Sequence, residues 1–243
     1  MAKKKLVRIR ELPLFSNVVQ DPFSRQGRWR RDYFHNDAPI TLEIGCGKAD
    51  FMVAMAQRAP DQNFIGLDLK AARLWVGAKN ALTHQLHNIA LIHGNAAQLT
   101  DMFGPEEIAE IWLTFPDPYP QKPRKRLISP AFLSRYRQIL HQDGLIHLKT
   151  DSEALFRWAL FVIRREHCTL VKKVDNLDEV PDCEAELKIQ TTYEQRHRAL
   201  GQTIRYLCFS LDRCSTTMQQ NSANGTILAN HQVKVLNYHF DID

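Results

Sequence analysis

The sequence contains no long apolar segment. In its 243 residues, no run approaches the ~18 consecutive apolar residues that a membrane-spanning helix requires. The first ten residues, MAKKKLVRIR, are basic and have neither an apolar stretch nor a small-residue cleavage site, so they do not form a secretory signal. The composition, 44% hydrophobic and 24% charged, is that of an ordinary globular protein. We therefore expect a cytoplasmic protein that has no membrane partner.

Cysteine is scarce as well. The cysteines are odd in number, and no two of them have C-x-x-C spacing: Cys46, Cys168, Cys183, Cys208 and Cys214. The ten histidines are scattered, without the spacing of metal ligands. These patterns argue against a disulfide framework and against a zinc site, and we expect no metal.

Positive charge is concentrated at the N-terminus. Residues 1–35 carry nine basic and three acidic residues, a net charge of +6, whereas the whole chain has +5, so the remaining residues carry −1. Four aromatic residues are interleaved with this charge: Phe23, Trp29, Tyr33 and Phe34. A basic arm of this kind fits a phosphate-rich partner. The alternative is a solvated tail that only aids solubility.

From residue 40 onward, short apolar runs alternate with longer amphipathic segments. Seven runs have the length and β-branched content of strands: 40–46, 63–69, 88–95, 110–115, 144–150, 169–174 and 203–211. Four longer segments have apolar residues at helical spacing: 49–59, 70–86, 130–140 and 152–166. This alternation predicts an α/β fold with a mostly parallel, seven-stranded sheet that is covered by helices on both faces.

The chain therefore divides into three parts. Residues 1–37 are expected to form a basic N-terminal arm, residues 38–211 the α/β domain, and residues 212–243 a polar C-terminal extension. The extension is rich in Gln, Asn and Ser, which predicts partial disorder, although its stretch QVKVLNYHF could form a strand or dock. The sequence leaves open whether the protein is a monomer or a homodimer.

The first strand of the domain ends in a glycine turn. Ligands of an open parallel sheet bind beyond the carboxyl ends of its strands, and here the sequence EIGCGKAD places Glu43, Gly45 and Gly47. The two glycines allow a sharp turn close to a ligand. A dinucleotide-binding turn needs a third glycine where this chain has Asp50, and a phosphate-binding loop needs G-K-[ST] where it has G-K-A. The turn therefore suits a ligand without a pyrophosphate.

The next two strands end in polar residues. Asp68 stands where an acid can bond to both hydroxyls of a ribose, and Asn95 can pair with an adenine edge. Taken singly, either residue could instead cap a helix or close a turn. Together with the glycine turn, they suit a nucleoside that carries no phosphates. S-adenosylmethionine is such a ligand, and Glu43 would lie near its amino-acid end.

A more specific motif follows the fourth strand. The stretches LEIGCGKADF, FIGLDL, TFPDPYPQK, HLKTD and TTYEQRHRALGQTI occur in this order between about residues 38 and 211. In these motifs the chain resembles the bacterial tRNA (guanine-N7-)-methyltransferase family. The resemblance implies a Rossmann-like class I methyltransferase that uses S-adenosylmethionine. It also implies a tRNA substrate, methylated on a guanine in the variable loop, at position 46.

The resemblance also implies the roles of individual residues. It places the cofactor contacts on Glu43, Asp68, Asn95 and Asp117, in addition to the glycine turn, and the catalytic role on Asp117. It places the tRNA or guanine contacts on Gln121, Lys122, Asp151, Thr191, Thr192, Tyr193 and Glu194. The chain departs from the family pattern at three positions: Asn95 replaces an acid, Tyr119 a tryptophan, and Gln121 a lysine.

The expected chemistry agrees with a lone carboxylate in a proline-framed loop. Guanine N7 has a lone pair and no proton, so its methylation needs no base but creates a cation that Asp117 would stabilise. Six basic residues after this loop are expected near phosphates: Lys122, Arg124, Lys125, Arg126, Arg135 and Arg137.

Three alternative functions stay open. They are methylation of an exocyclic amine, for which D-P-P-[YFW] is typical, a non-catalytic RNA-binding module, and a NAD-dependent dehydrogenase.

Overall fold

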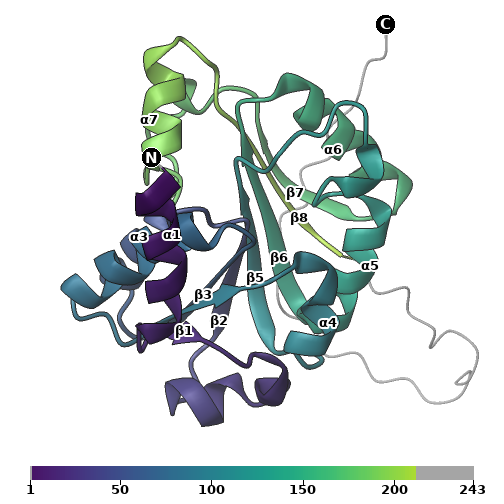
Figure 1. Cartoon of the computed structure of the whole chain (residues 1–243). Coiled ribbons are helices and arrows are strands. Elements are labelled where there is room, and N and C mark those ends of the chain that lie inside the picture. The colour runs from purple at the N-terminus through teal and green to yellow at the C-terminus, as the bar shows by residue number, and fades with distance from the viewer. Residues whose placement is uncertain (1, 212–243) are drawn as a thin grey trace, which may run out of the picture.

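The computed structural model describes residues 2–211, so the predicted C-terminal extension lies outside the described residues. One mixed sheet runs through the molecule, with helices on both sides (Figure 1). The strands are β1 Val18–Val19, β2 Ile40–Ile44, β3 Asn63–Asp68, β4 Ile89–His93, β5 Ile108–Thr114, β6 Leu140–Thr150, β7 Thr169–Val174 and β8 Arg205–Ser210. The helices are α1 Ala2–Glu11, α2 Asp50–Arg58, α3 Ala71–Thr83, α4 Leu99–Met102, α5 Pro130–Ile139, α6 Glu153–Arg165 and α7 Thr192–Ala199.

The sheet confirms the predicted α/β fold and adds one strand to it. Its order is β1-β4-β3-β2-β5-β6-β8-β7; β1 to β6 run parallel, and β8 is antiparallel to both of its neighbours. All seven predicted strands are present. The eighth, β1, pairs Val18 and Val19 with Leu91 and Ile92, and two residues are too few to show a periodic pattern. The strand order reverses beside β2, which opens a crevice at the carboxyl ends of β2 and β5.

Burial explains why the central strands read as apolar runs. Every residue of β2 and β3 is buried, because helices cover both faces of the parallel part of the sheet. One face packs against α2 and α3, through residues such as Phe51 and Leu74. The other face packs against α4, α5 and α6, through residues such as Met102, Leu133 and Phe156. Within residues 2–211, no helix combines the length and the apolarity needed to cross a membrane.

The N-terminal segment is packed onto the domain. Trp29 has 0% exposure and donates its indole N–H to the Met102 carbonyl at 2.8 Å. Phe34 is also buried, and the Tyr33 hydroxyl donates to the Ile89 carbonyl at 3.1 Å. The expectation that the aromatic residues serve a phosphate-rich partner is therefore wrong for Trp29, Tyr33 and Phe34, because their rings pack in or against the core. Only Phe23 of the four is exposed.

A buried carboxylate also holds this segment in place. Glu107 is buried, and its two oxygens accept from three backbone N–H groups, those of Gly27, Trp29 and Gly104, each at 2.8 Å. A Cβ on Gly104 would lie 2.7 Å from Cα of Gly27, so the close approach of the two backbones requires glycine at this position. Glu107 thus joins the N-terminal segment to the loop before β5.

We expect Glu107→Ala to lower the free energy of unfolding by about 2–4 kcal/mol, because buried N–H groups lose a charged acceptor. Glu107→Gln keeps one acceptor oxygen and should cost less. Urea unfolding of the wild type and both variants measures the difference. An unchanged midpoint in the alanine variant would contradict the role of Glu107.

Candidate active site

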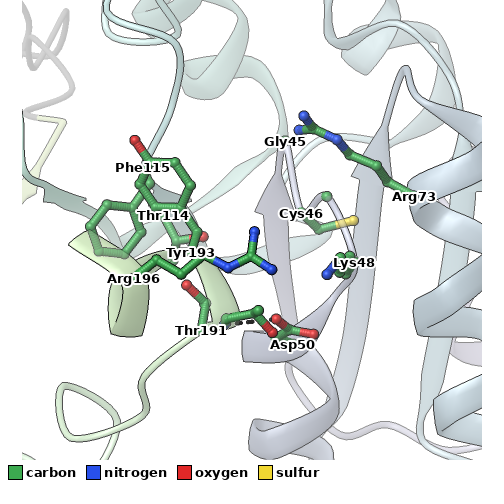
Figure 2. Close-up of a pocket in the computed structure, with 12 residues that line it drawn as sticks. Gly45, Cys46, Lys48, Asp50, Arg73, Thr114, Phe115, Thr191, Tyr193 and Arg196 are labelled. Carbon is green, nitrogen blue, oxygen red and sulfur yellow. Dashed lines mark hydrogen bonds between the residues drawn. The ribbon is translucent and has the colours of Figure 1, made fainter. Parts of the chain in front are cut away.

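A cavity lies where the strand order reverses, at the carboxyl ends of β2 and β5 (Figure 2). Its volume is about 210 Å³. The glycine turn, the end of β5 and the first turns of α7 form its walls, with Arg73 of α3. The lining residues are Gly45, Cys46, Gly47, Lys48, Asp50, Arg73, Thr114, Phe115, Thr191, Thr192, Tyr193 and Arg196.

The predicted glycine turn is present. Gly45 and Gly47 have φ angles of +82° and +58°, which side chains other than glycine rarely tolerate. The Gly45 N–H donates to the Leu67 carbonyl at 2.8 Å, so the turn crosses from β2 to the end of β3. A Cβ on Gly77 of α3 would lie 2.5 Å from the Lys48 carbonyl oxygen, so the turn also packs directly on α3.

Asp68 and Asn95 each have a local structural role. Asp68 accepts from the Gly47 N–H at 2.8 Å and from the Lys70 N–H at 2.6 Å. Asn95 caps a short helix by accepting from the Ala97 N–H at 2.9 Å. Neither residue lines the cavity. A carboxylate has about four lone-pair sites, so Asp68 retains acceptor capacity, and the ribose and adenine roles of these residues stay predictions.

Glu43 is buried beside the glycine turn. Its exposure is 1%, and its Oε1 accepts from the Thr114 hydroxyl. Its Oε2 has no hydrogen-bond partner among the described residues. Burial, assisted by repulsion from Asp50 and Asp68, raises the pKa of Glu43 to about 8, although the Thr114 bond opposes the rise. A buried acceptor without a partner fits a ligand that brings a charged N–H donor.

The proline-framed loop after β5 has a constrained backbone. Phe115 and Tyr119, each of which precedes a proline, have positive φ angles of 50° and 38°. Arg126 is buried, donates to the Pro118 carbonyl at 2.8 Å and stacks over the Trp158 ring at 4.7 Å. The loop is thereby fixed from behind, while Asp117 remains exposed on its surface.

The cluster of six basic residues separates into two groups. Arg126 is not near phosphates as expected, because it is buried under the loop. Arg135 and Arg137 also donate to backbone carbonyls of the protein, those of Ala97 and Glu166, each at 3.1 Å. The side chains exposed for a polyanion are Lys122, Arg124 and Lys125, with Gln121 beside them.

Helix α7 is anchored by a buried ion pair. Lys149 of β6 and Glu194 of α7 are 1% and 0% exposed, and Nζ lies 2.7 Å from Oε2. Burial lowers the pKa of Lys149, and the charge of Glu194 opposes this shift. Arg198 bonds to the other Glu194 oxygen at 2.9 Å. The predicted contact between Glu194 and the substrate is therefore wrong, because its carboxylate is fully enclosed by the protein.

The start of α7 closes one side of the cavity. Thr191 caps the helix by accepting from the Glu194 N–H at 3.1 Å. The Thr192 N–H donates to Asp50 at 2.9 Å, across 142 residues of sequence. Thr191, Thr192 and Tyr193 all line the cavity, as their predicted substrate role requires. The structure thus brings together the first and last of the sequence motifs.

Asp151 is paired with two side chains of α7. Its Oδ2 lies 2.7 Å from Nδ1 of His197 and accepts from the Tyr193 hydroxyl at 3.3 Å. The Tyr193 and His197 rings are stacked with their centroids 3.9 Å apart, and the centroid of the Phe115 ring lies 5.2 Å from that of Tyr193. Sequence reasoning missed Lys149, Arg196 and His197. A predicted helix over the TTYEQRHRALG motif would have placed Arg196 and His197 one turn after Thr192 and Tyr193.

Comparisons with known proteins agree with the geometry. Residues 37–207 match the protein family described as "Putative methyltransferase". A tRNA (guanine-N(7)-)-methyltransferase from Porphyromonas gingivalis is 42% identical over 208 residues, which cover 81% of this chain and 85% of the relative. Another, from Christiangramia forsetii, is 39% identical over 221 residues, which cover 86% and 99%.

Among solved structures, the 16S rRNA methyltransferase KamB has a similar fold. Its TM-score is 0.59 at 15% sequence identity, and the match covers 76% of this chain and 93% of that chain. This likeness supports the Rossmann-like class I methyltransferase fold.

Within residues 2–211, no group of three or more His, Cys, Asp or Glu side chains could hold a metal ion.

The buried Glu43 predicts a stability that depends on pH. Its pKa is about 8 in the folded protein and about 4.3 in an unfolded chain. The folded state therefore binds the proton more tightly, so the contribution of Glu43 to the free energy of unfolding is full below about pH 4.3 and is lost as the pH rises to about 8. We expect Glu43→Gln to remove this loss.

Urea unfolding of wild type and Glu43→Gln, between about pH 5 and about pH 8, measures this linkage. The wild type should lose stability relative to the variant as the pH rises. Parallel curves for the two proteins would show that Glu43 is ionised throughout this range.

Proposed function

Because the chain belongs to the tRNA (guanine-N(7)-)-methyltransferase family, we propose that it transfers the methyl group of S-adenosylmethionine to N7 of a guanine in tRNA. We propose further that this guanine is position 46, in the variable loop. The observation that carries the proposal is the exposed Asp117 on a rigid loop at the carboxyl end of β5, beside the cavity at the glycine turn.

The residues around the cavity fit the cofactor. When bound, S-adenosylmethionine supplies a methyl group on a positively charged sulfur. Glu43 offers the unpaired acceptor Oε2, and the turn at Gly45 and Gly47 allows close approach. Asp68 ends β3 and Asn95 follows β4, where they would hold the ribose and the adenine. We assign the cofactor contacts to Glu43, Gly45, Gly47, Asp68, Asn95 and Asp117.

Asp117 is the proposed catalytic residue. Methylation of N7 leaves a positive charge on the purine, and a carboxylate that is already in position stabilises that charge without reorganising during the reaction. Three prolines and the bond from Arg126 to the Pro118 carbonyl hold the loop. No general base is required, because guanine N7 carries no proton.

Asp151 is the proposed acceptor for the guanine edge opposite N7. Guanine presents N1–H and the exocyclic amine as donors, and a carboxylate can accept from both. His197 and Tyr193 orient this carboxylate through its Oδ2. Gln121 and Lys122, both exposed on the loop after Asp117, would contact the RNA next to the target nucleotide.

The alternatives from the sequence are less well supported. The motif reads D-P-Y-P rather than D-P-P-[YFW], and the relatives at 36–42% identity that span most of the chain are named as guanine-N7 enzymes, not as exocyclic amine enzymes. The missing third glycine disfavours NAD binding. A non-catalytic RNA-binding module would retain tRNA binding without turnover, and direct assay separates it from the enzyme.

The deciding experiment is transfer of a labelled methyl group to unmodified tRNA, followed by nucleoside analysis. We expect 7-methylguanosine as the sole labelled product. A tRNA with 7-deazaguanine at position 46 lacks the acceptor nitrogen and should accept no methyl group. Label on another nucleoside would refute the proposed reaction, and label that persists in the 7-deazaguanine tRNA would refute the proposed position.

We expect Asp117→Asn to lower kcat roughly 100-fold, because one fixed charge that stabilises the developing cation is lost. Binding of tRNA and thermal stability should change little, since the side chain is exposed. Asp143→Asn, an exposed carboxylate on β6, is the matched control. Normal turnover by Asp117→Asn would remove this residue from the mechanism.

The basic charge of α1 is expected to bind tRNA phosphates. Lys4, Lys5 and Arg10 are exposed, whereas Arg8 stacks on Trp75 at 4.9 Å and holds the helix on α3. Replacing the three exposed residues with Gln should weaken tRNA binding and reduce the slope of log K against log salt by about 2–3. Filter binding over a salt series measures this slope. An unchanged slope would show that α1 makes no phosphate contact.

A further inference from the structure

Three cationic side chains line the cavity without a partner. Lys48 follows Gly47 in the turn, Arg73 lies in the first turn of α3, and Arg196 lies on α7. Among residues 2–211, the side-chain nitrogens of these three residues make no hydrogen bond or ion pair. Asp50, the one acid in the cavity lining, already accepts from the Thr192 N–H. The cavity lining therefore carries three positive charges against one negative charge.

Arg196 lies across the cavity from Lys48 and Arg73. Figure 2 shows Arg196 extending from α7 toward the glycine turn, with Lys48 and Arg73 on the opposite side. Arg196 lies one helical turn after Thr192, on the helix face that lines the cavity. Glu194, two residues earlier, faces the interior and is fixed by Lys149. Arg196 is thus presented by a helix whose orientation is already set.

The position of the cavity identifies the part of the cofactor that these cations face. Asp68 and Asn95, the proposed ribose and adenine contacts, do not line the cavity. The cavity lining instead includes Thr114 and Phe115 at the end of β5, two residues before Asp117. The glycine turn, which also lines the cavity, directly follows Glu43, a buried residue outside the lining whose Oε2 lacks a hydrogen-bond partner. The cations of the lining suit the carboxylate of an α-amino acid, and the Glu43 acceptor next to the turn suits its ammonium group.

We infer that Arg196, together with Lys48 and Arg73, binds the carboxylate of the amino-acid portion of S-adenosylmethionine. This inference rests on the proposed function. It makes α7 a part of the cofactor site as well as of the tRNA site, since Tyr193 and His197 of the same helix orient Asp151.

The test compares two cofactors that differ only in the carboxylate. Isothermal titration in the absence of tRNA gives Kd for S-adenosylmethionine and for decarboxylated S-adenosylmethionine. We expect the wild type to prefer the first by roughly tenfold or more, the effect of one charge-assisted bond. Arg196→Gln should lose most of this preference by weakening the carboxylated ligand alone. Arg196→Lys, which keeps a cation, should retain part of it.

Arg164→Gln is the matched control, because Arg164 is an exposed arginine on α6 outside the cavity. Its preference should equal that of the wild type. The inference is overturned if Arg196→Gln keeps the full preference, or if it weakens both cofactors equally, which would mean that Arg196 only supports the pocket. It is also overturned if the variant binds both cofactors normally and loses tRNA affinity, because the cation then serves RNA phosphate.

Different results would contradict the proposed function and the role of Arg196. If wild-type protein binds neither cofactor, the proposed function fails. If wild-type protein binds S-adenosylmethionine and methylates tRNA, but its preference for the carboxylate survives in Arg196→Gln, only the role of Arg196 fails.

Discussion

The buried ion pair between Lys149 and Glu194 determines the geometry of the candidate active site. Removing both charges from water costs several kcal/mol per ion, and the attraction between them offsets this cost only if further bonds satisfy each group. Lys149 obtains these bonds from the Leu187 and Ile189 carbonyls, each at 3.0 Å, and Glu194 obtains one from Arg198. All of these partners come from the segment that leads into α7 or from α7 itself. The charges are therefore satisfied only when α7 is seated against β6.

Lys149 also links α7 to the catalytic loop. Its side chain holds α7, while its backbone carbonyl accepts from the Phe115 N–H at 2.7 Å, one residue before the proline-framed loop. A shift of β6 would move both together. Lys149 thus contacts both the helix that carries Tyr193 and the residue that leads into the loop that carries Asp117. Arg126 completes the arrangement by holding the loop from its other side. Rigid positioning of this kind is what catalysis by a fixed charge requires.

The parts of the fold that could be predicted from sequence are those in which burial leaves either a continuous apolar run or a periodic apolar pattern. Strands β2 and β3 are buried on both faces and read as apolar runs, and α2 and α3 show helical spacing. Helix α7 was missed because its buried side is the charged Glu194 and its other faces are polar, so no apolar stripe exists. The N-terminal segment was misread for the opposite reason. Its net charge and interleaved aromatic residues suggested a basic arm for a phosphate-rich partner, whereas Trp29 and the distant Glu107 anchor it to the domain, and no local pattern relates these two residues.

Within single motifs of the candidate site, some residues line the cavity and others are buried in the protein. In TTYE, Thr192 and Tyr193 line the cavity, but Glu194 faces the interior, because successive residues of a helix point about 100° apart. In KTD, Lys149 is enclosed and Asp151 reaches the edge of the site. A motif therefore combines residues that contact ligands with residues that hold them, and sequence alone treats both alike. Burial separates them. Arg196 lies outside every predicted set of ligand contacts. It is identified by its place in the cavity lining and by the absence of a partner among residues 2–211.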